Sequence, residues 1–196
     1  MILLARHGET DDNVPPLRFQ GRRDTPLNAR GRAQGTHCGS ILRDLLIRDG
    51  CDLATINYVS SPLKRATETM ALVRKELALP PEEFAIDGRL AEIAFGDWEG
   101  FTIAQLHQRD PHRIVQREQD KWHFLPPGGE SYEMVSARMR DWYESLTRDT
   151  VAVAHGGTAR GLMAHLGIAK PAAAPLIDIM QGEVYVFQGS QMSRYA

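Results

Sequence analysis

The stretch TVAVAHGGTARGLMAHLG, residues 150–167, decides the fold class of this chain. Its first five residues are apolar or β-branched with no polar alternation, which predicts a strand buried on both faces. From Gly156 onward, apolar residues recur at helical spacing, and Gly167 provides a helix terminator. A buried strand that leads directly into a helix is typical of an α/β domain, and His155 stands at the junction.

The same succession of strand and helix occurs along the rest of the chain. Asn28 is expected to cap the first helix, and Ser61 followed by Pro62 to begin the second. Two strands joined by a hairpin near Gln181 and Gly182 are predicted over 177–189. The other predicted strands are 1–7, 55–61 and 150–155, and the predicted helices are 29–50, 62–79, 132–149 and 156–167.

This alternation predicts a three-layer α/β/α sandwich with a mainly parallel sheet. The length of 196 residues and the hydrophobic content of 42% suit a single domain, 1–196. The segment at about 101–130 interrupts the alternation, since it is rich in His, Arg, Gln and Asp. We interpret it as an inserted lid segment, a helix and loop over one edge of the sheet.

Two features of this insertion have alternative interpretations. Arg113, Arg117 and Lys121 are spaced four residues apart, so they form either a solvated basic stripe or a lid surface that meets an anionic substrate. The aromatic residues form either an apolar wall beside a site or the packing that holds the insertion on the sheet. These aromatic residues are Trp98, Phe101, Trp122 and Phe124.

Composition excludes several classes of function. The net charge of −2 and the lack of a polybasic run argue against a nucleic-acid partner. Cys38 and Cys51 have no metal-ligand spacing, so reduced thiols in a cytoplasmic protein are expected. The apolar start is too short for a signal peptide, and no run approaches the ~18 apolar residues of a membrane span. The sequence leaves a homodimer open.

Charged and small residues follow three of the predicted strands. The first strand ends at Arg6 and His7, Arg65 lies in the first turn of the helix after the second, and the third ends at His155 and Gly156. Because ligands bind beyond the carboxyl ends of parallel strands, these groups should converge. Two cations and two helix N-termini favour a tetrahedral dianion such as phosphate. A metal held by the two histidines is the rival, but the adjacent arginines raise its electrostatic cost.

With these residues, the sequence resembles the histidine phosphatase superfamily, which includes cofactor-dependent phosphoglycerate mutases and many phosphomonoesterases. The resemblance spans nearly the whole chain and depends on several segments in order, whereas the tripeptide RHG alone would be weak. These segments are LLARHGET at 3–10, QGRRDTPLNARGRAQ at 20–34, VSSPLKRATETM at 59–70, RLAEIAFGDWEG at 89–100, PPGGESYEMVSARM at 126–139 and VAVAHGGTARGLM at 151–163.

The resemblance implies a role for each matching residue. His7 would be the nucleophile that accepts a phosphoryl group, and Glu92 would supply general acid chemistry. Arg6, Arg65 and His155 would hold the phosphoryl oxygens. Asn13 and the region of Gly21 would assist them, and the small residue Gly156 would let backbone amides approach the phosphate.

The chemistry explains why these residue types are needed. Only a neutral imidazole is a nucleophile, and the neighbouring arginines should depress the pKa of His7. Glu92 can protonate the leaving alkoxide and then take a proton from the water that attacks phosphohistidine. Asp87, Asp97 and Glu99 are nearby carboxyl groups, and motif position selects Glu92 among them. Neither a metal nor a cofactor is required.

The expected activity is that of a phosphomonoesterase acting on small phosphorylated metabolites. The stretch FGDWEG, residues 95–100, and the short segment after it resemble the phosphatase branch more than the mutases. A cofactor-dependent phosphoglycerate mutase is the alternative. A phosphate-binding regulatory relative without turnover is a third hypothesis, from a different class of protein.

Overall fold

The computed structural model describes residues 1–196. Its centre is a six-stranded sheet in the order β3-β2-β4-β1-β5-β6. The four strands from β3 to β1 are parallel, whereas β5 pairs antiparallel with β1 and with β6. The strands are β1 (Ile2–Arg6), β2 (Asn57–Ser60), β3 (Ala85–Ile86), β4 (Thr150–Ala154), β5 (Val184–Gln188) and β6 (Gln191–Tyr195).

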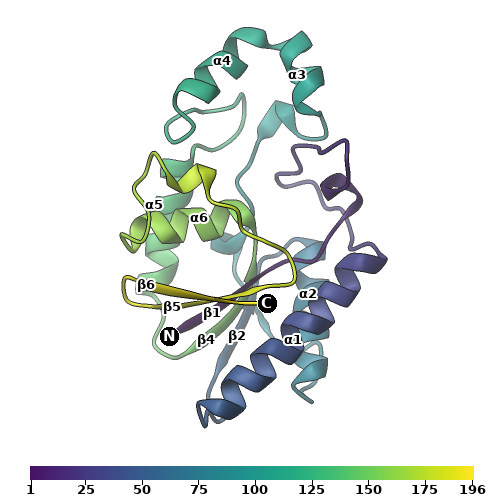
Figure 1. Ribbon diagram of the computed structural model, residues 1–196, viewed down its shortest axis with the longest axis vertical. Helices are drawn as coiled ribbons and strands as arrows, with labels where there is room; N and C mark the ends of the chain where they lie inside the picture. The colour runs from purple at the N-terminus through teal and green to yellow at the C-terminus, as the bar shows by residue number, and fades with distance from the viewer.

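Helices cover both faces of this sheet. In Figure 1, α1 and α2 lie on one side of the strands, and α5 and α6 lie on the other. The predicted three-layer sandwich with a mainly parallel sheet is therefore confirmed. The helices are α1 (Ala29–Arg48), α2 (Lys64–Glu76), α3 (Ile103–Arg109), α4 (Pro111–Gln119), α5 (Tyr132–Glu144) and α6 (Gly156–His165). None of them combines the length and the apolarity that a membrane crossing requires.

The alternating side chains of β1 supply both hydrophobic cores. Leu3 and Ala5 belong to the core under α1 and α2, whereas Ile2 and Leu4 belong to the core under α5 and α6. Successive side chains of a strand point to opposite faces, so a strand between two helical layers must be apolar throughout. The first four residues of β1 are buried, and the strand ends at Arg6, which is only partly buried.

The predicted start of the second helix is wrong by two residues. Ser61 is not its cap, because α2 begins at Lys64 with Leu63 in the cap position. The Ser61 hydroxyl instead accepts a hydrogen bond from the Leu63 amide at 3.3 Å and lies 2.7 Å from His155 Nε2. A tertiary partner therefore engages the hydroxyl that local sequence assigned to the helix. By contrast, Asn28 caps α1 as predicted, since its side chain accepts from the Gly31 amide.

The predicted hairpin near Gln181 and Gly182 is also wrong. The hairpin joins β5 to β6, around Gly189 at φ +58°, and residues 177–181 form an irregular loop. Carbonyl groups of this loop accept hydrogen bonds from arginine side chains rather than from a neighbouring strand. Arg160 Nε donates to the Ile177 carbonyl at 2.8 Å, and Arg6 Nη1 donates to the Ile179 carbonyl at 2.6 Å.

The segment 101–130 holds two short helices rather than the single helix expected. In Figure 1, α3 and α4 stand at the top of the molecule, beyond α6. A small core of Trp98, Leu106 and Ile114 holds them, with Phe101 and Phe124 against it. These aromatic residues thus pack the segment together, while Trp122 belongs to the core under α5.

The end of β1 is locked to the start of α1 by contact between backbones. A Cβ atom on Gly8 would lie 2.1 Å from the Gly31 carbonyl oxygen, and one on Gly31 would lie 2.1 Å from the Glu9 carbonyl oxygen. Both distances are far below van der Waals contact, so only glycine allows this approach. The close approach sets the position of His7, which lies between Arg6 and Gly8.

Gly31→Ala should therefore destabilise the protein, although alanine is the better helix former. Forced overpacking of this kind costs about 1–3 kcal/mol of unfolding free energy. Gly88→Ala is the matched control, because nothing lies within 4 Å of a Cβ atom there. Urea unfolding of both variants checks the expectation. Equal stabilities for the two would contradict the close approach.

Candidate active site

The candidate site lies at the carboxyl ends of β1 and β4. The parallel register pairs Arg6 with Ala154, so the next residues, His7 and His155, come side by side. Their ring centroids are 5.0 Å apart. Arg65, in the first turn of α2, is close enough to both rings to influence their titration. The structure thus brings together the two histidines and two arginines of the sequence motifs.

His7 is held as a neutral ring with one free nitrogen. Its side chain is buried, and Nδ1 lies 2.7 Å from the carbonyl oxygen of Gly8. A carbonyl can only accept, so Nδ1 carries the proton and Nε2 keeps its lone pair. Burial, and then the charges of Arg6 and Arg65, hold the pKa of His7 well below its usual range. The unprotonated Nε2 is therefore available as a nucleophile.

His155 is fully buried and has a different partner. Its Nε2 lies 2.7 Å from Ser61 Oγ, and its Nδ1 has no partner in the protein. Because Ser61 Oγ accepts from the Leu63 amide, its own proton is free to go to Nε2. That leaves the His155 proton on Nδ1. Burial, and then Arg65, hold the pKa of His155 well below its usual range, so Nδ1–H donates from a neutral ring.

The two arginines are held by backbone carbonyls rather than by carboxylates. Arg65 donates from Nη1 to the Arg23 carbonyl and from Nη2 to the Gly21 carbonyl, each at 2.7 Å. Arg6 donates from Nη1 to the Ile179 carbonyl. Burial lowers the pKa of Arg65 to about 10, and Arg65 stays charged near neutral pH. Neither guanidinium has a carboxylate within salt-bridge distance.

Unpartnered polar atoms are concentrated at this site. Four buried side-chain nitrogen or oxygen atoms in the chain lack a hydrogen-bond partner, and they are Arg6 Nε, Arg65 Nε, His155 Nδ1 and Tyr58 Oη. The first three belong to the cluster around His7. Buried donors almost always have an acceptor, and leaving one unpaired costs about 1–3 kcal/mol. The cluster is therefore built to surround an acceptor that comes from outside the protein.

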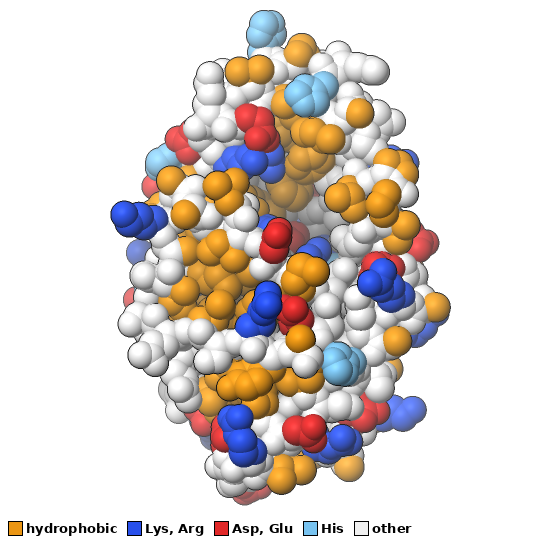
Figure 2. Space-filling model, viewed as in Figure 1, with side chains coloured by type: hydrophobic (Ala, Val, Ile, Leu, Met, Phe, Trp, Pro, Cys, Tyr) orange, Lys and Arg blue, Asp and Glu red, His pale blue; other side chains and the backbone are white.

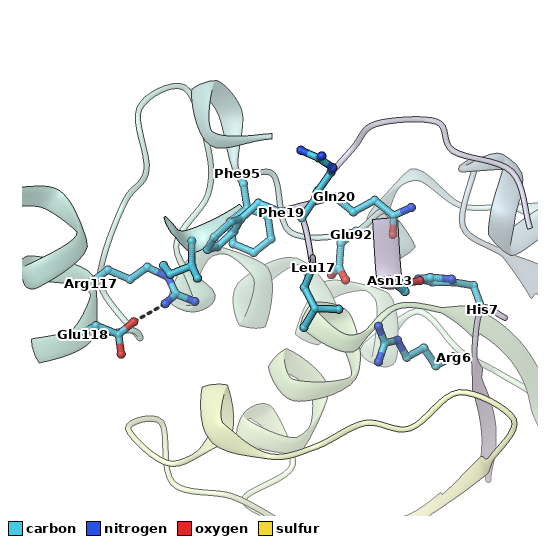
Figure 3. A pocket seen from close by; sticks show the side chains of 13 residues that line it. Arg6, His7, Asn13, Leu17, Phe19, Gln20, Glu92, Phe95, Arg117 and Glu118 are labelled. Atoms are coloured by element: carbon cyan, nitrogen blue, oxygen red, sulfur yellow. Dashed lines mark hydrogen bonds and ion pairs between the residues drawn. The ribbon is translucent and has the colours of Figure 1, made fainter. Parts of the chain in front are cut away.

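A cavity of about 370 Å³ opens beside His7. Figure 3 shows Arg6, His7, Asn13, Gln20 and Glu92 at one end of it, with Arg117 and Glu118 at the other. The full lining is Arg6, His7, Asn13, Leu17, Arg18, Phe19, Gln20, Gly21, Glu92, Phe95, Ile103, Arg117 and Glu118.

Glu92 presents one carboxylate oxygen to this cavity. Its Oε1 accepts hydrogen bonds from the amides of Ile93 at 2.8 Å and Gly157 at 2.9 Å. Those two bonds fix the carboxyl group against the start of α6 and leave Oε2 without a protein partner. The geometry places an acid or base within the same cavity as His7.

The three remaining predicted residues have distinct positions. Asn13 Oδ1 accepts from the Thr10 amide and from Gln181 Nε2, which orients its Nδ2 as a free donor in the cavity wall. Gly21 lies at φ +52° and supplies a carbonyl to Arg65. Gly156 does not line the cavity; it begins α6, and a Cβ atom on it would lie 3.3 Å from Arg160 Nη1.

The sequence motifs did not identify several residues that support the site. Ser61 binds His155 although they are 94 residues apart, and Gln181 binds Asn13 although they are 168 residues apart. Gln20 donates to Thr10 Oγ1 at 2.8 Å and also lines the cavity. Ser61 and Gln20 lie within the matched segments, but the segments do not show which residues they bind. Partners 94 and 168 residues apart leave no periodic or local signal along the sequence.

The predicted basic stripe divides into separate contacts. Arg117 lines the cavity, whereas Arg113 pairs with Asp110 at 3.2 Å and Lys121 pairs with Glu118 at 2.9 Å. Only one member of the stripe can therefore meet a ligand at this site.

The sequence as a whole matches the profile of the histidine phosphatase superfamily (branch 1) over residues 2–193. The chain belongs to this superfamily. It is 34% identical to a bifunctional protein of Mycobacterium tuberculosis over 94% of this chain, but over only 46% of that protein. The chain thus spans about half the length of the first curated relatives that it matches.

Other members of the superfamily are similar over most of their length. A glucosyl-3-phosphoglycerate phosphatase of Mycobacterium tuberculosis is 35% identical, over 84% of this chain and 74% of that protein. A solved structure of a mycobacterial glucosyl-3-phosphoglycerate phosphatase in complex with VO3 has a TM-score of 0.78 and 29% identity, covering 99% of this chain and 95% of that one.

The two buried histidines should make this superfamily member less stable in acid. Because the folded-state pKa of each lies below the ordinary value of about 6.5, the unfolded chain binds more protons below that pH. The free energy of unfolding should then fall between about pH 6.5 and pH 5, by at most about 1.4 kcal/mol per pH unit for each histidine. Urea unfolding across this range measures the slope.

Two variants separate this effect from other titrations. His7→Gln should remove up to half of the part of the slope that the two histidines contribute, whereas Gln108→Ala, at an exposed position without a titratable group, should leave the slope as it is. The same slope in His7→Gln as in the original chain would mean that His7 is already charged in the folded state.

Ser61→Ala tests the proposed tautomer of His155. The substitution removes the only partner of Nε2, so we expect the proton to shift from Nδ1 toward Nε2 in part of the molecules. The ¹⁵N chemical shifts of the imidazole distinguish the two tautomers, and Ser61→Thr keeps the hydroxyl as a matched control. A His155 tautomer that does not respond to Ser61→Ala would contradict the assignment.

Proposed function

We propose that this protein is a phosphomonoesterase that hydrolyses small phosphorylated metabolites through a phosphohistidine on His7. The observation that carries the proposal is the unprotonated His7 Nε2 surrounded by three unpartnered donors. A tetrahedral phosphoryl group satisfies all three at once, because its oxygens point in different directions. Phosphatases among the relatives support the same class of reaction.

In the first step, His7 Nε2 attacks phosphorus in line with the ester oxygen. The bond from phosphorus to that oxygen breaks, and Glu92 gives the leaving alkoxide its proton. Arg6, Arg65 and His155 Nδ1–H hold the three remaining oxygens and stabilise the charge that they carry in the transition state. Since all three donors are already fixed, little reorganisation is needed as the reaction proceeds.

In the second step, water attacks the phosphorus of phosphohistidine on the side that the alcohol has left. Glu92, now ionised, takes a proton from this water, so that the carboxyl group returns to its starting form. The bond from phosphorus to His7 Nε2 breaks and inorganic phosphate leaves. Asn13 Nδ2 is a further donor for the phosphoryl oxygens in both steps.

The chain 1–196 acts in this proposal as a single domain, with the segment 101–130 forming one side of the cavity. Ile103 of α3 and Arg117 of α4 bring this segment to the cavity lining. The segment therefore contacts the alcohol part of the substrate rather than the phosphoryl group. A phosphatase must admit water to phosphohistidine, whereas a mutase must keep water away from phosphohistidine.

Substitution of His7 and of Glu92 should have separable effects on hydrolysis. His7→Ala should abolish both phosphate release and an acid-labile phosphoenzyme. Glu92→Gln should lower kcat/KM, which reflects the first step alone, by about 10²–10⁴ for an alkyl phosphate, since that leaving group needs a proton. The loss should be much smaller for p-nitrophenyl phosphate, whose phenolate leaves without one. Asp97→Asn, an exposed neighbouring carboxyl group, is the control.

Three outcomes would contradict parts of this proposal. No phosphate release by the folded protein would remove the enzymatic function. A phosphoenzyme that persists in His7→Ala would identify another nucleophile. Interconversion of 2- and 3-phosphoglycerate that exceeds phosphate release would favour the mutase.

A further inference from the structure

We propose that the alcohol part of the substrate has an apolar face, and that Leu17 and Ile103 select for it. The preferred substrates would be phosphate esters of aromatic or branched aliphatic alcohols, rather than of polyols or hydroxy acids. This inference rests on the proposed function, because it concerns the part of the same cavity that lies beyond the phosphoryl group.

The outer half of the cavity is mostly apolar. Leu17 and Phe19 enter it from the loop after β1, Phe95 from the segment after Glu92, and Ile103 from the first turn of α3. Figure 3 shows Leu17, Phe19 and Phe95 between the end that carries His7 and the end that carries Arg117. Figure 2 shows a hollow below α3 and α4 with hydrophobic side chains along its wall. A ligand that extends outward from His7 must pass these side chains.

One wall of this half consists of aromatic rings packed against one another. The rings of Phe19 and Phe95 meet edge to face, with centroids 4.9 Å apart, and Phe19 also contacts the buried ring of Trp98 at 5.8 Å. Fixed aromatic rings of this kind lose little freedom when a ligand packs on them. The wall is therefore ready to receive a flat or branched hydrocarbon surface.

Two apolar side chains at the mouth of the cavity are exposed. Leu17 is 62% exposed and Ile103 is 43% exposed, and both line the cavity. A ligand with an apolar face would remove this hydrocarbon surface from water, which favours binding roughly in proportion to the area covered. A polyol would cover the same surface without that gain and would need polar partners in exchange.

The outer half offers few polar partners for a polyol or an acid. The Nη1 atom of Arg117 is bound to Glu118 Oε1 at 2.6 Å, and its guanidinium lies over the Phe19 ring at 5.3 Å. The Nη1 atom of Arg18 donates to the Gly100 carbonyl at 2.8 Å. Glu118 also opposes the approach of a carboxylate to Arg117. Arg117 is thus engaged with Glu118, and Arg18 with a backbone carbonyl.

The test compares substrates that share the phosphoryl group but differ beyond it. We expect kcat/KM for 1-naphthylmethyl phosphate, an alkyl ester whose leaving group is as basic as the others, to exceed that for glycerol 3-phosphate and for phosphoglycolate by about tenfold or more. The ratio of kcat/KM for the naphthyl substrate to kcat/KM for glycerol 3-phosphate should fall several-fold in Leu17→Ser and in Ile103→Ser. Most of this fall should come from a higher KM for the naphthyl substrate. Both positions are exposed, so the variants should fold, and thermal unfolding verifies that they do.

Val115→Ser is the matched control, because Val115 is 54% exposed on α4 but does not line the cavity. Its substrate ratio should equal that of the original chain. A ratio that is the same in all three variants and the original chain would overturn the proposal. The proposal would also be overturned if phosphoglycolate had the highest kcat/KM of the three substrates and Arg117→Met removed that preference. The outer half of the cavity would then bind an anion.

A binding measurement separates this inference from the proposed function. Phenylphosphonate and methylphosphonate carry the same anionic group and cannot be hydrolysed as esters. Calorimetry should show tighter binding of phenylphosphonate, and Leu17→Ser should reduce the difference. If phenylphosphonate binds more tightly but no ester is hydrolysed, the apolar site would be supported and the phosphatase function would be contradicted. If esters are hydrolysed but the two phosphonates bind equally, the phosphatase function would be supported and the apolar site would be contradicted.

Discussion

The parallel pairing of β1 with β4 is the constraint on which the site depends. It aligns Arg6 with Ala154, and the amide of His7 then donates to the Ala154 carbonyl at 2.9 Å. Both strands are covered on both faces, so a shift in register would move apolar side chains out of the two cores. The energy that fixes the sheet therefore also fixes the distance between His7 and His155, even though no bond joins their rings.

The second feature of the site is positive charge that carboxylates do not neutralise. Arg6 and Arg65 are held by carbonyl groups from residues 179, 21 and 23, which are dipoles rather than anions. Burial of the two histidines, and then these charges, hold the pKa of each ring down. The same charges remain available to a phosphoryl group. An arrangement that costs stability without a ligand thus favours both a neutral nucleophile and an anionic substrate.

The two halves of the cavity come from different parts of the fold. The ends of β1 and β4 provide the part around His7, where backbone contacts such as that of Gly8 with Gly31 leave no freedom. The outer part comes from the loop that carries Leu17 and from α3 and α4, which have their own small core. Substitutions in the outer part can therefore alter the preference for an alcohol without disturbing the phosphoryl site.

The sequence alone determined β1, β2 and β4, the sandwich and the group of His7, Arg6, Arg65 and His155, because these depend on local periodicity and on the ends of strands. It did not predict the short strand β3 or the last strand β6. It misplaced the start of α2 and the last hairpin, where Ser61 and the carbonyls of residues 177–181 bind partners far away in the chain. Only the tertiary structure decided which histidine nitrogen is free, which donors lack partners, and that Arg117 alone of its stripe reaches the cavity. These properties follow from contacts between side chains and distant backbone groups, and such contacts have no period along a sequence.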